Sequence, residues 1–467
     1  MIKDEFTYES SSFRDNFGNV FNYKDKILRS VKIVASKNYE FLKDNYIFEK
    51  SINSNFLIKF QEMDKNKLPK YFGQFKYVLE SKTIPFISYP YEWSFDQLKD
   101  AALHHLNFQI FLLNLNTILR DSSAYNVQFI NGRPIFIDVL SLKKYEEGEY
   151  WTGYGQFCEN FLNPLLLGSL KGIRHNDWFK GSLEGISTRE FNKILSLKDK
   201  ISLKILIHIV GHSNLQNQNI NNPKKIEKKL KNIKKFQKSS YLFLLKQIKN
   251  WIENLKFKKS KTIWENYENE HTYNKLEFEE KKIIVGNFVE KIKPEKLIDL
   301  GCNTGIFSEV AISKGATNVV GLDFDDNAIS QAYKKSFEKK INFLPLVLNL
   351  ANPSPNQGWM QNERKGLIER FKSDALVALA LEHHLVIGKN IPIVQFLKWI
   401  KNIARFGLIE FIPKTDETVL KMLSSRKDIF EDYNETYFEK KLSEQTKIVN
   451  KHIISKSGRI IFEYEII

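Results

Sequence analysis

Short apolar segments alternate with amphipathic ones along the last third of the chain, from about residue 296. Buried strands are typically short and apolar, and this description fits KLIDL, TNVVGLD, INFLPLVLNL, DALVALAL and FGLIEFIP. Apolar residues at helical spacing occur between them in GIFSEVAISKG, DNAISQAYKKSFEKK and IPIVQFLKWIKNIA. The last segment, TKIVNKHIISKSGRIIFEYEII, predicts two further strands around a turn. The order predicts an α/β fold with a seven-stranded, doubly wound, Rossmann-like sheet.

The residues before this alternation divide into two parts. Residues 1–215 mix strand and helix patterns and predict an α+β domain, with a strand in TIPFISYPYEW (83–93) and a long helix in FDQLKDAALHHLNFQIFLLNLN. Residues 216–262 predict a basic helical connector that begins near Pro223. Its apolar residues recur at helical spacing with lysines between them: Leu242, Leu245, Ile248, Ile252 and Leu255. Residues 263–467 then form the third unit.

Most of the net charge of +16 lies in the predicted connector. Between Lys224 and Lys261 there are 14 lysines and two glutamates, a net charge of +12. A solvated lysine-faced helix explains this pattern, and so does a peripheral contact with an anionic lipid, glycan or RNA surface. A nucleic-acid partner is the less favoured of these, because the sequence contains no stacking-aromatic RNA module.

The composition also limits the cellular setting. No run of 18 apolar residues occurs, so we expect no transmembrane helix. The start, MIKDEFTYESSSF, lacks the basic and apolar parts of a signal peptide. Cys158 and Cys302 are too few and too far apart for a disulfide scaffold or a cysteine zinc site. These features favour a cytoplasmic protein.

The loop after the first predicted strand, LIDLGCNTG (297–305), indicates a cofactor site. Gly301 and Gly305 lack Cβ atoms, so the backbone can turn tightly and approach a ligand. Ligands of doubly wound sheets bind beyond the carboxyl ends of the strands. Asp323 ends the second strand, where it can accept hydrogen bonds from both hydroxyls of a ribose. Asp299 suits an ammonium group better than a phosphate, and the G-x-G-x-x-G of dinucleotide folds is absent.

With both acids in place, the chain from Trp264 onward resembles the class I S-adenosylmethionine-dependent methyltransferases. Nearly the whole chain also resembles a bacterial family akin to the nodulation protein NoeA, through YPYEWSFDQLKDAAL, DSSAYNVQF with INGRPIFIDVLSL, LALEHHL and LIEFIPKTDETV. The resemblance implies S-adenosyl-L-methionine as the cofactor. The residues that it implies for cofactor binding are Asp299, Gly301, Cys302, Asn303, Thr304, Gly305, Asp323, Phe324, Asn349, Leu350 and Ala380.

Candidate catalytic residues follow the fourth predicted strand. His383 or His384 can be the base that removes a proton from a hydroxyl acceptor, since an imidazole has a suitable pKa. Glu382 can orient one imidazole or bind the methionine ammonium group. Plain packing at the strand end is the alternative for each histidine. Weaker candidates are Glu410 in strand five and an aromatic lid from Trp264, Tyr267 and Tyr273.

The N-terminal half contains a second candidate site. Asp121, Asn126 and Asp138 have almost the spacing of the catalytic Asp and metal-binding Asn and Asp in enzymes that resemble protein kinases and aminoglycoside phosphotransferases. The resemblance implies ATP and Mg²⁺, with Asn126 and Asp138 as metal ligands. The phosphate-covering loop is weak, however, with Gly18 as its one glycine and Arg29 or Lys32 as its cation. An unrelated acceptor-binding domain is the alternative.

These features predict a methyltransferase that O-methylates a glycan, a glycolipid or a related small-molecule acceptor selected by the N-terminal domain. The alternatives are a bifunctional kinase and methyltransferase acting on a surface saccharide, or an RNA-modifying methyltransferase. His208 and His212 have helical spacing but no third ligand, so we expect no metal there, and none at His104 or His105.

Overall fold

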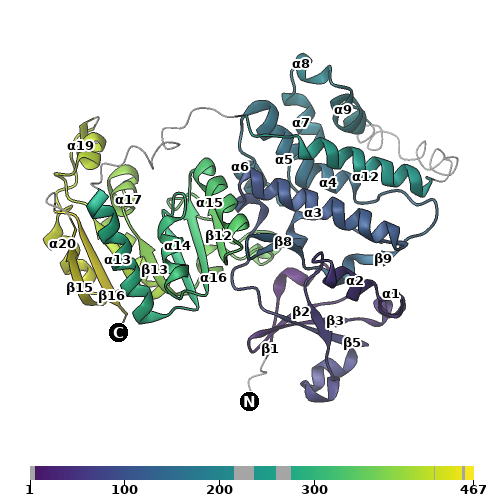
Figure 1. Cartoon of the computed structure of the whole chain (residues 1–467), viewed down its shortest axis with the longest axis horizontal. Coiled ribbons are helices and arrows are strands. Elements are labelled where there is room, and N and C mark those ends of the chain that lie inside the picture. The colour runs from purple at the N-terminus through teal and green to yellow at the C-terminus, as the bar shows by residue number, and fades with distance from the viewer. Residues whose placement is uncertain (1–5, 215–235, 259–274, 425, 455–457, 467) are drawn as a thin grey trace.

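The computed structural model describes residues 6–214, 236–258, 275–424, 426–454 and 458–466. Two regions of different architecture lie side by side (Figure 1). We call residues 6–258 the N-terminal region and residues 275–466 the C-terminal region, in both cases for the described residues only. No helix among these residues is both long and apolar enough to cross a membrane.

The C-terminal region is built on a seven-stranded sheet with the order β12-β11-β10-β13-β14-β16-β15. The first five strands in this order are parallel, and β16 is antiparallel to both of its neighbours. The predicted Rossmann-like sheet is therefore confirmed. The strands are β10 (Lys296–Leu300), β11 (Asn318–Asp323), β12 (Phe343–Val347), β13 (Ser373–Ala378), β14 (Ala404–Phe411), β15 (Lys447–Ile453) and β16 (Ile460–Glu465).

Helices cover both faces of this sheet, which explains why its central strands are apolar without alternation. Leu297, Ile298 and Leu300 of β10 have no exposed surface, although successive side chains point to opposite faces. The helices are α13 (Lys275–Ile292), α14 (Ile306–Ser313), α15 (Asp326–Lys339), α16 (Leu367–Arg370), α17 (Glu382–Lys389), α18 (Ile393–Lys401), α19 (Glu417–Ser424) and α20 (Glu435–Ser443).

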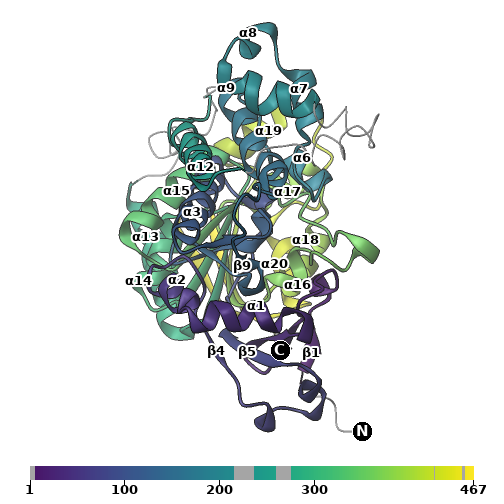
Figure 2. The same cartoon turned by 90° about the vertical axis from the view of Figure 1, so that its right-hand side faces the viewer.

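The N-terminal region begins with a small antiparallel sheet, in the order β1-β2-β3-β5-β4, which lies at one end of the molecule (Figures 1 and 2). The sheet is followed by two short strand pairs, β6-β9 and β7-β8. The strands of the N-terminal region are β1 (Phe6–Tyr8), β2 (Val20–Tyr23), β3 (Lys26–Val31), β4 (Phe60–Glu62), β5 (Tyr77–Lys82), β6 (Thr117–Leu119), β7 (Val127–Ile130), β8 (Arg133–Phe136) and β9 (Leu142–Lys144).

The rest of the N-terminal region is helical and is organised around α3 (Phe95–Asn114). The Ser94 hydroxyl caps this helix by accepting a hydrogen bond from the Gln97 amide, and the Gln97 side-chain oxygen accepts one from the Ser94 amide. The other helices are α1 (Ile33–Asp44), α2 (Ile47–Asn53), α4 (Tyr154–Phe157), α5 (Asn163–Leu166), α6 (Asn176–Gly181), α7 (Thr188–Ile194), α8 (Leu197–Lys200), α9 (Leu203–Ile205) and α12 (Lys238–Glu253), with π-helical turns at Cys158–Leu162, Leu167–Lys171 and Leu206–Gly211.

The strand predicted for residues 83–93 is wrong. The chain there is irregular after β5 and ends in a 3-10 turn, Pro90–Glu92. Pro85 and Pro90 have no N–H group to donate to a neighbouring strand. Hydrogen bonds with the Gln128 side chain satisfy the backbone of Ser88 instead. The aromatic residues are buried by packing between the two regions rather than in a sheet.

The second half of the predicted connector is α12, which packs along α3. Tyr241 and Ile248 of α12 are fully buried, and the Tyr241 hydroxyl accepts a hydrogen bond from Gln109 Nε2 at 2.8 Å. Lys99 Nζ donates to the Glu253 and Leu255 carbonyls at the end of the helix. This helix therefore belongs to the core of the N-terminal region. The first half of the predicted connector, with Pro223, lies outside the described residues.

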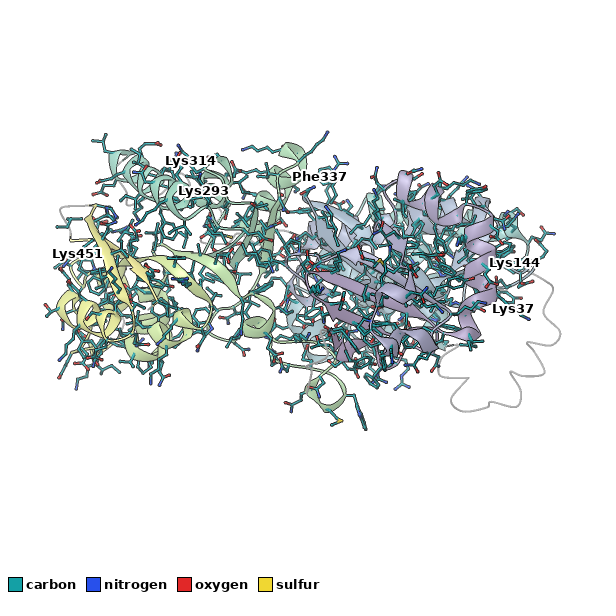
Figure 3. All side chains as sticks on the ribbon, turned by 90° about the horizontal axis from the view of Figure 1, so that it is seen from below. Lys37, Lys144, Lys293, Lys314, Phe337 and Lys451 are labelled. Atoms are coloured by element: carbon teal, nitrogen blue, oxygen red, sulfur yellow. The ribbon has the colours of Figure 1, made fainter. Side chains whose placement is uncertain are left out.

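The two regions meet in a polar, buried interface. Arg370 forms an ion pair with Glu92, and its Nη1 also donates to the Ile87 carbonyl at 2.6 Å. Both side chains are almost completely buried. The Tyr333 hydroxyl of the C-terminal region donates to Asp100 Oδ2 of the N-terminal region at 2.8 Å. Figure 3 shows Phe337 at the same boundary, where the Arg133 guanidinium lies 4.7 Å from its ring centroid.

We predict that Arg370→Met lowers the free energy of unfolding by about 3–5 kcal/mol, because it leaves the Glu92 carboxylate buried without its cation. The measurement is denaturant unfolding of the full chain. Arg405→Met is the matched control, since the Arg405–Glu465 pair is largely exposed and should contribute less than about 1 kcal/mol. Equal effects of the two substitutions would contradict the importance of the buried pair.

Candidate functional site

A cavity of about 480 Å³ lies at the carboxyl ends of β10, β11, β12 and β13. Its wall combines the loops after these strands with residues of the N-terminal region. This position agrees with the general rule for ligands of doubly wound sheets. The cavity contains all the residues implied for cofactor binding except Gly305, which lies just behind the wall.

The glycine loop after β10 has the backbone that its sequence predicts. Gly301 has a φ of 78° and Gly305 a φ of 83°, which disfavour residues with a Cβ atom. A Cβ atom on Gly305 would lie 2.5 Å from the Phe343 ring. Between the glycines, Asn303 has a φ of 48°, and its side-chain oxygen accepts from the Thr304 amide at 2.8 Å. The loop is therefore a tight turn with its backbone at the cavity wall.

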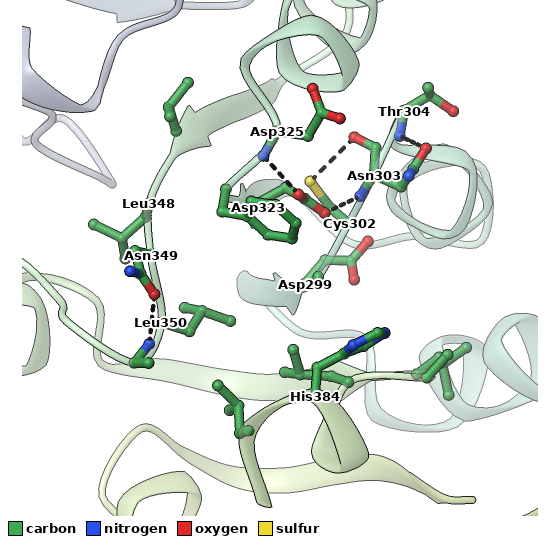
Figure 4. Close-up of a pocket in the computed structure, with 18 of the residues that line it drawn as sticks. Asp299, Cys302, Asn303, Thr304, Asp323, Asp325, Leu348, Asn349, Leu350 and His384 are labelled. Atoms are coloured by element: carbon green, nitrogen blue, oxygen red, sulfur yellow. Dashed lines mark hydrogen bonds between the residues drawn. The ribbon is translucent and has the colours of Figure 1, made fainter. Parts of the chain in front are cut away.

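Two buried acids flank this loop (Figure 4). Asp299 accepts a hydrogen bond from the Ser308 hydroxyl at 2.6 Å, and burial raises the pKa of its carboxyl to about 7. Asp323 accepts bonds from the Asn303 amide at 2.9 Å and the Asp325 amide at 3.0 Å. Burial also raises the pKa of the Asp323 carboxyl. A cationic or hydroxyl-bearing ligand would compensate for the desolvation of these groups.

The side of the cavity after β12 is mostly apolar. It is formed by Leu348, Asn349 and Leu350 (Figure 4), and the half-exposed Phe324, which follows β11, also lines the cavity. The Asn349 side-chain oxygen accepts from the Ala351 amide at 3.0 Å. An apolar wall of this kind is suited to the faces of a flat aromatic ring, such as a nucleobase.

A buried ion pair holds the loop after β13 in place. Lys281 Nζ lies 2.6 Å from Glu410 Oε1, and neither side chain has more than 1% exposed surface. Glu410 Oε2 accepts a hydrogen bond from the Ala380 amide at 2.9 Å. Ala380 lines the cavity with a φ of 49°, a strained value for alanine. Sequence reasoning missed Lys281, because nothing local links it to a partner 129 positions away.

The three candidate catalytic residues do not share one surface. His384 lines the cavity, on the Asp299 side in Figure 4, and burial lowers its pKa. His383 is outside the cavity lining and 2% exposed, and burial lowers its pKa well below the ordinary value. Glu382 accepts hydrogen bonds from the Ile412 amide at 2.8 Å and the Tyr433 hydroxyl at 2.5 Å. Its carboxylate thus holds the end of β14.

The N-terminal region forms the outer wall of the cavity. Arg174, Asp177 and Lys180 line it from α6 and the preceding turn. Arg174 Nη1 donates to the Phe324 carbonyl at 2.7 Å, and Lys180 Nζ donates to the Asn352 carbonyl at 3.3 Å. No motif marks these residues in the sequence. Their contacts depend on how the two regions pack together.

The kinase-like candidates lie together in the N-terminal region. Asp121 accepts hydrogen bonds from Asn126 Nδ2 at 3.1 Å and from the Ser141 hydroxyl at 2.5 Å. Asp138 pairs with Arg29 at 2.9 Å, although burial raises the pKa of its carboxyl to about 6. No group of three or more His, Cys, Asp or Glu side chains that could hold a metal ion exists within the described ranges. Asp121 and Asp138 thus have protein partners.

Gly18 has a packing role in this structure. A Cβ atom at this position would lie 2.1 Å from the Ser30 carbonyl oxygen, so the close approach of two strands requires a glycine. Lys32 Nζ donates to the Asp15 carbonyl at 3.1 Å. These contacts explain the residue types of this segment as packing and hydrogen bonding within the protein, without a bound phosphate.

The histidine pairs singled out as possible metal ligands pack against other side chains or the backbone. His208 Nδ1 lies 2.7 Å from the Tyr154 hydroxyl, and the His212 ring packs on the same tyrosine. His104 Nε2 lies 3.0 Å from the Phe56 carbonyl, while burial lowers the pKa of His105 to about 3. The proposed aromatic lid, Trp264, Tyr267 and Tyr273, lies outside the described residues.

The sheet order gives the C-terminal region a Rossmann-like fold, and its sequence matches a methyltransferase family. The family described as Ribosomal protein L11 methyltransferase (PrmA) matches residues 284–361. Ubiquinone biosynthesis O-methyltransferase, mitochondrial, of Dictyostelium discoideum is 31% identical over 131 residues, or 28% of this chain and 38% of that protein.

The chain as a whole belongs to the NoeA family. It is 41% identical over 457 residues to Nodulation protein NoeA of Rhizobium meliloti (strain 1021). The match covers 98% of this chain and 95% of that protein. The resemblance stated from the sequence is therefore confirmed.

Solved structures are similar over part of the chain. The N-methyltransferase NodS from Bradyrhizobium japonicum WM9, in complex with S-adenosyl-L-homocysteine, is 12% identical with a TM-score of 0.31 and covers 42% of this chain and 89% of that one. WbdD is 19% identical with a TM-score of 0.29 and covers 40% of each chain.

We predict that Asp299→Asn stabilises the ligand-free protein at pH 8 but not at pH 4. The folded-state pKa of about 7 exceeds the ordinary value of 3.8, so the unfolded chain ionises first and folding is penalised increasingly as pH rises from 4 to 7. At pH 8 the free energy of unfolding of Asp299→Asn, measured by denaturant unfolding, should exceed that of the wild type by on the order of 2–4 kcal/mol.

Asp428→Asn is the control for this experiment. Asp428 is exposed and paired with Lys414, which lowers its pKa, so its replacement should change stability little at either pH. If Asp299→Asn were less stable than the wild type at pH 8, the Asp299 carboxyl could not be penalised by desolvation as we infer.

Proposed function

We propose that the chain is an S-adenosylmethionine-dependent methyltransferase that methylates a hydroxyl of a saccharide or a related small molecule. The observation that carries this proposal is the placement of Asp299 and Asp323 on either side of one glycine turn in one cavity. The NoeA and methyltransferase relatives support the same activity.

The residues of the cavity fit this cofactor. Asp323 has two carboxylate oxygens for the ribose hydroxyls, and Asp299 would bind the ammonium group of the methionine part. The apolar wall with Phe324 and Leu350 suits the adenine faces. When bound, S-adenosylmethionine supplies an electrophilic methyl group. The protein then needs to bind the acceptor in line with that group and remove its proton.

His384 is the residue that we propose as the base. It lines the cavity, and its lowered pKa means that the imidazole is neutral near pH 7 and can accept a proton. His383 does not line the cavity, and we assign it a packing role. Glu382 positions the chain beside both histidines through Ile412 and Tyr433.

We further propose that the N-terminal region selects the acceptor. The cavity wall that it contributes is polar, with Arg174, Asp177 and Lys180. Such side chains can form several hydrogen bonds with a hydroxyl-rich molecule. An RNA acceptor is less favoured, because the sequence contains no stacking-aromatic RNA module. We add no phosphotransfer activity, since Asp138 is paired with Arg29 and Asp121 is held by Asn126 and Ser141.

We predict that Asp323→Asn weakens binding of S-adenosylhomocysteine at least about tenfold, since an amide replaces one of the two acceptors for the ribose hydroxyls. Isothermal titration calorimetry measures the affinity. Asp326→Asn is the matched control, because Asp326 is also a buried acid, with a pKa raised to about 7 by burial, but does not line the cavity. Equal affinities for the wild type and Asp323→Asn would refute the assignment of the ribose site.

We predict that His384→Gln slows methyl transfer by about 100-fold or more while leaving S-adenosylhomocysteine affinity unchanged, because only proton removal is affected. The measurement is transfer of labelled methyl groups to a panel of saccharides. His383→Gln should retain most of the transfer rate in protein that folds normally. If instead His383→Gln abolishes transfer and His384→Gln does not, the assignment of the base is wrong.

A further inference from the structure

A group of aliphatic side chains is exposed on consecutive turns of α8, α9 and the π-helical turn that follows. Leu197 is 86% exposed, Ile201 79% and Leu203 70%. Leu206 and Ile207 are 42% and 56% exposed, while the preceding Ile205 is buried. We call Leu197, Ile201, Leu203, Leu206 and Ile207 the aliphatic patch. Isolated exposed apolar residues are common, but five within 11 positions indicate a surface that binds something apolar.

Lysines alternate with the aliphatic patch along the chain. Lys198 and Lys204 are exposed and Lys200 is half-buried. The one acid among them, Asp199, is held by Lys171 at 2.5 Å. Lys198 and Lys200 form no ion pair with any of the described residues. The surface is thus apolar and positively charged together.

The aliphatic patch lies at an end of the molecule. In both views, α8 is the extremity of the N-terminal region opposite the small sheet, and α9 lies close to it (Figures 1 and 2). The boundary with the C-terminal region is elsewhere, around Glu92 and Arg370. A flat surface could therefore contact the patch without meeting the rest of the protein.

We propose that the aliphatic patch docks the protein on an anionic lipid bilayer. Aliphatic residues would enter the boundary between headgroups and acyl chains, and the lysines would extend toward the anionic headgroups. A protein partner fits less well, because protein interfaces are enriched in aromatic residues, methionine and arginine and depleted in lysine. The patch contains none of the enriched types. Positive charge beside the membrane adds attraction for anionic lipid specifically.

This docking is independent of methyl transfer, but it would place the reaction near a membrane. The cavity-wall residues Arg174, Asp177 and Lys180 precede the aliphatic patch in the chain, and the short helices α6, α7, α8 and α9 follow one another from the wall to the patch. A bilayer bound to the patch would therefore be joined to the acceptor side of the cavity by a short, folded stretch of chain. The class of acceptor that this arrangement favours is a saccharide attached to a lipid.

The experiment is co-sedimentation of the full chain with vesicles of phosphatidylcholine alone or with phosphatidylglycerol added. We expect the wild type to bind the anionic vesicles at least tenfold more tightly than the neutral ones. Leu197→Ser/Ile201→Ser should lose at least tenfold of that affinity. Lys198→Gln/Lys204→Gln should lose affinity and also show weaker salt dependence.

The matched control is Ile33→Ser/Val34→Ser, which removes two other highly exposed aliphatic side chains, on α1. This variant should bind anionic vesicles like the wild type. No vesicle binding by the wild type, or equal loss in the control, would overturn the proposal. So would a concentration-dependent dimer that the Leu197→Ser/Ile201→Ser variant abolishes, since a second copy would then be the occupant of the patch.

Discussion

The buried ion pair of Arg370 and Glu92 determines how the two regions of this protein fit together. A buried charge is tolerated only when its partner and hydrogen bonds are in place. Arg370 therefore holds Glu92 and the Ile87 carbonyl, and the Ser354 hydroxyl donates to the same glutamate at 2.8 Å. Because Ser354 lines the cavity, the pair connects the interface directly to the candidate site. The relative position of the two regions is specified by polar groups that have few alternative partners.

The sequence predicted the C-terminal sheet well because its signals are local. Each central strand is buried on both faces and is therefore apolar along its length, and the glycine turn after β10 requires positive φ at Gly301 and Gly305. The N-terminal region was harder. Residues 83–93 have the aromatic content of a strand, but prolines and a tertiary contact with Gln128 prevent it. Local composition cannot reveal such a contact.

The residues of the candidate site also divide into those with a local sequence signal and those that depend on tertiary contacts. Asp299 and Asp323 could be found from their positions at strand ends, whereas Lys281 and Arg174 reach the cavity through long-range packing. The neighbours His383 and His384 illustrate a further limit. They begin the same helix, yet only His384 lines the cavity. Successive helical residues point about 100° apart, so adjacency in sequence does not imply a shared surface.

A cavity with walls from both regions couples ligand binding to the interface. A ligand that contacts Asp299 and Asp323 on one side and Arg174 on the other binds only when the two regions are packed together. By mass action it stabilises that packed arrangement in proportion to its concentration. The strain at Ala380 has a separate origin, since the Lys281–Glu410 pair within the C-terminal region holds this loop through the Ala380 amide. The interface is thus part of the binding site and not merely a junction between domains.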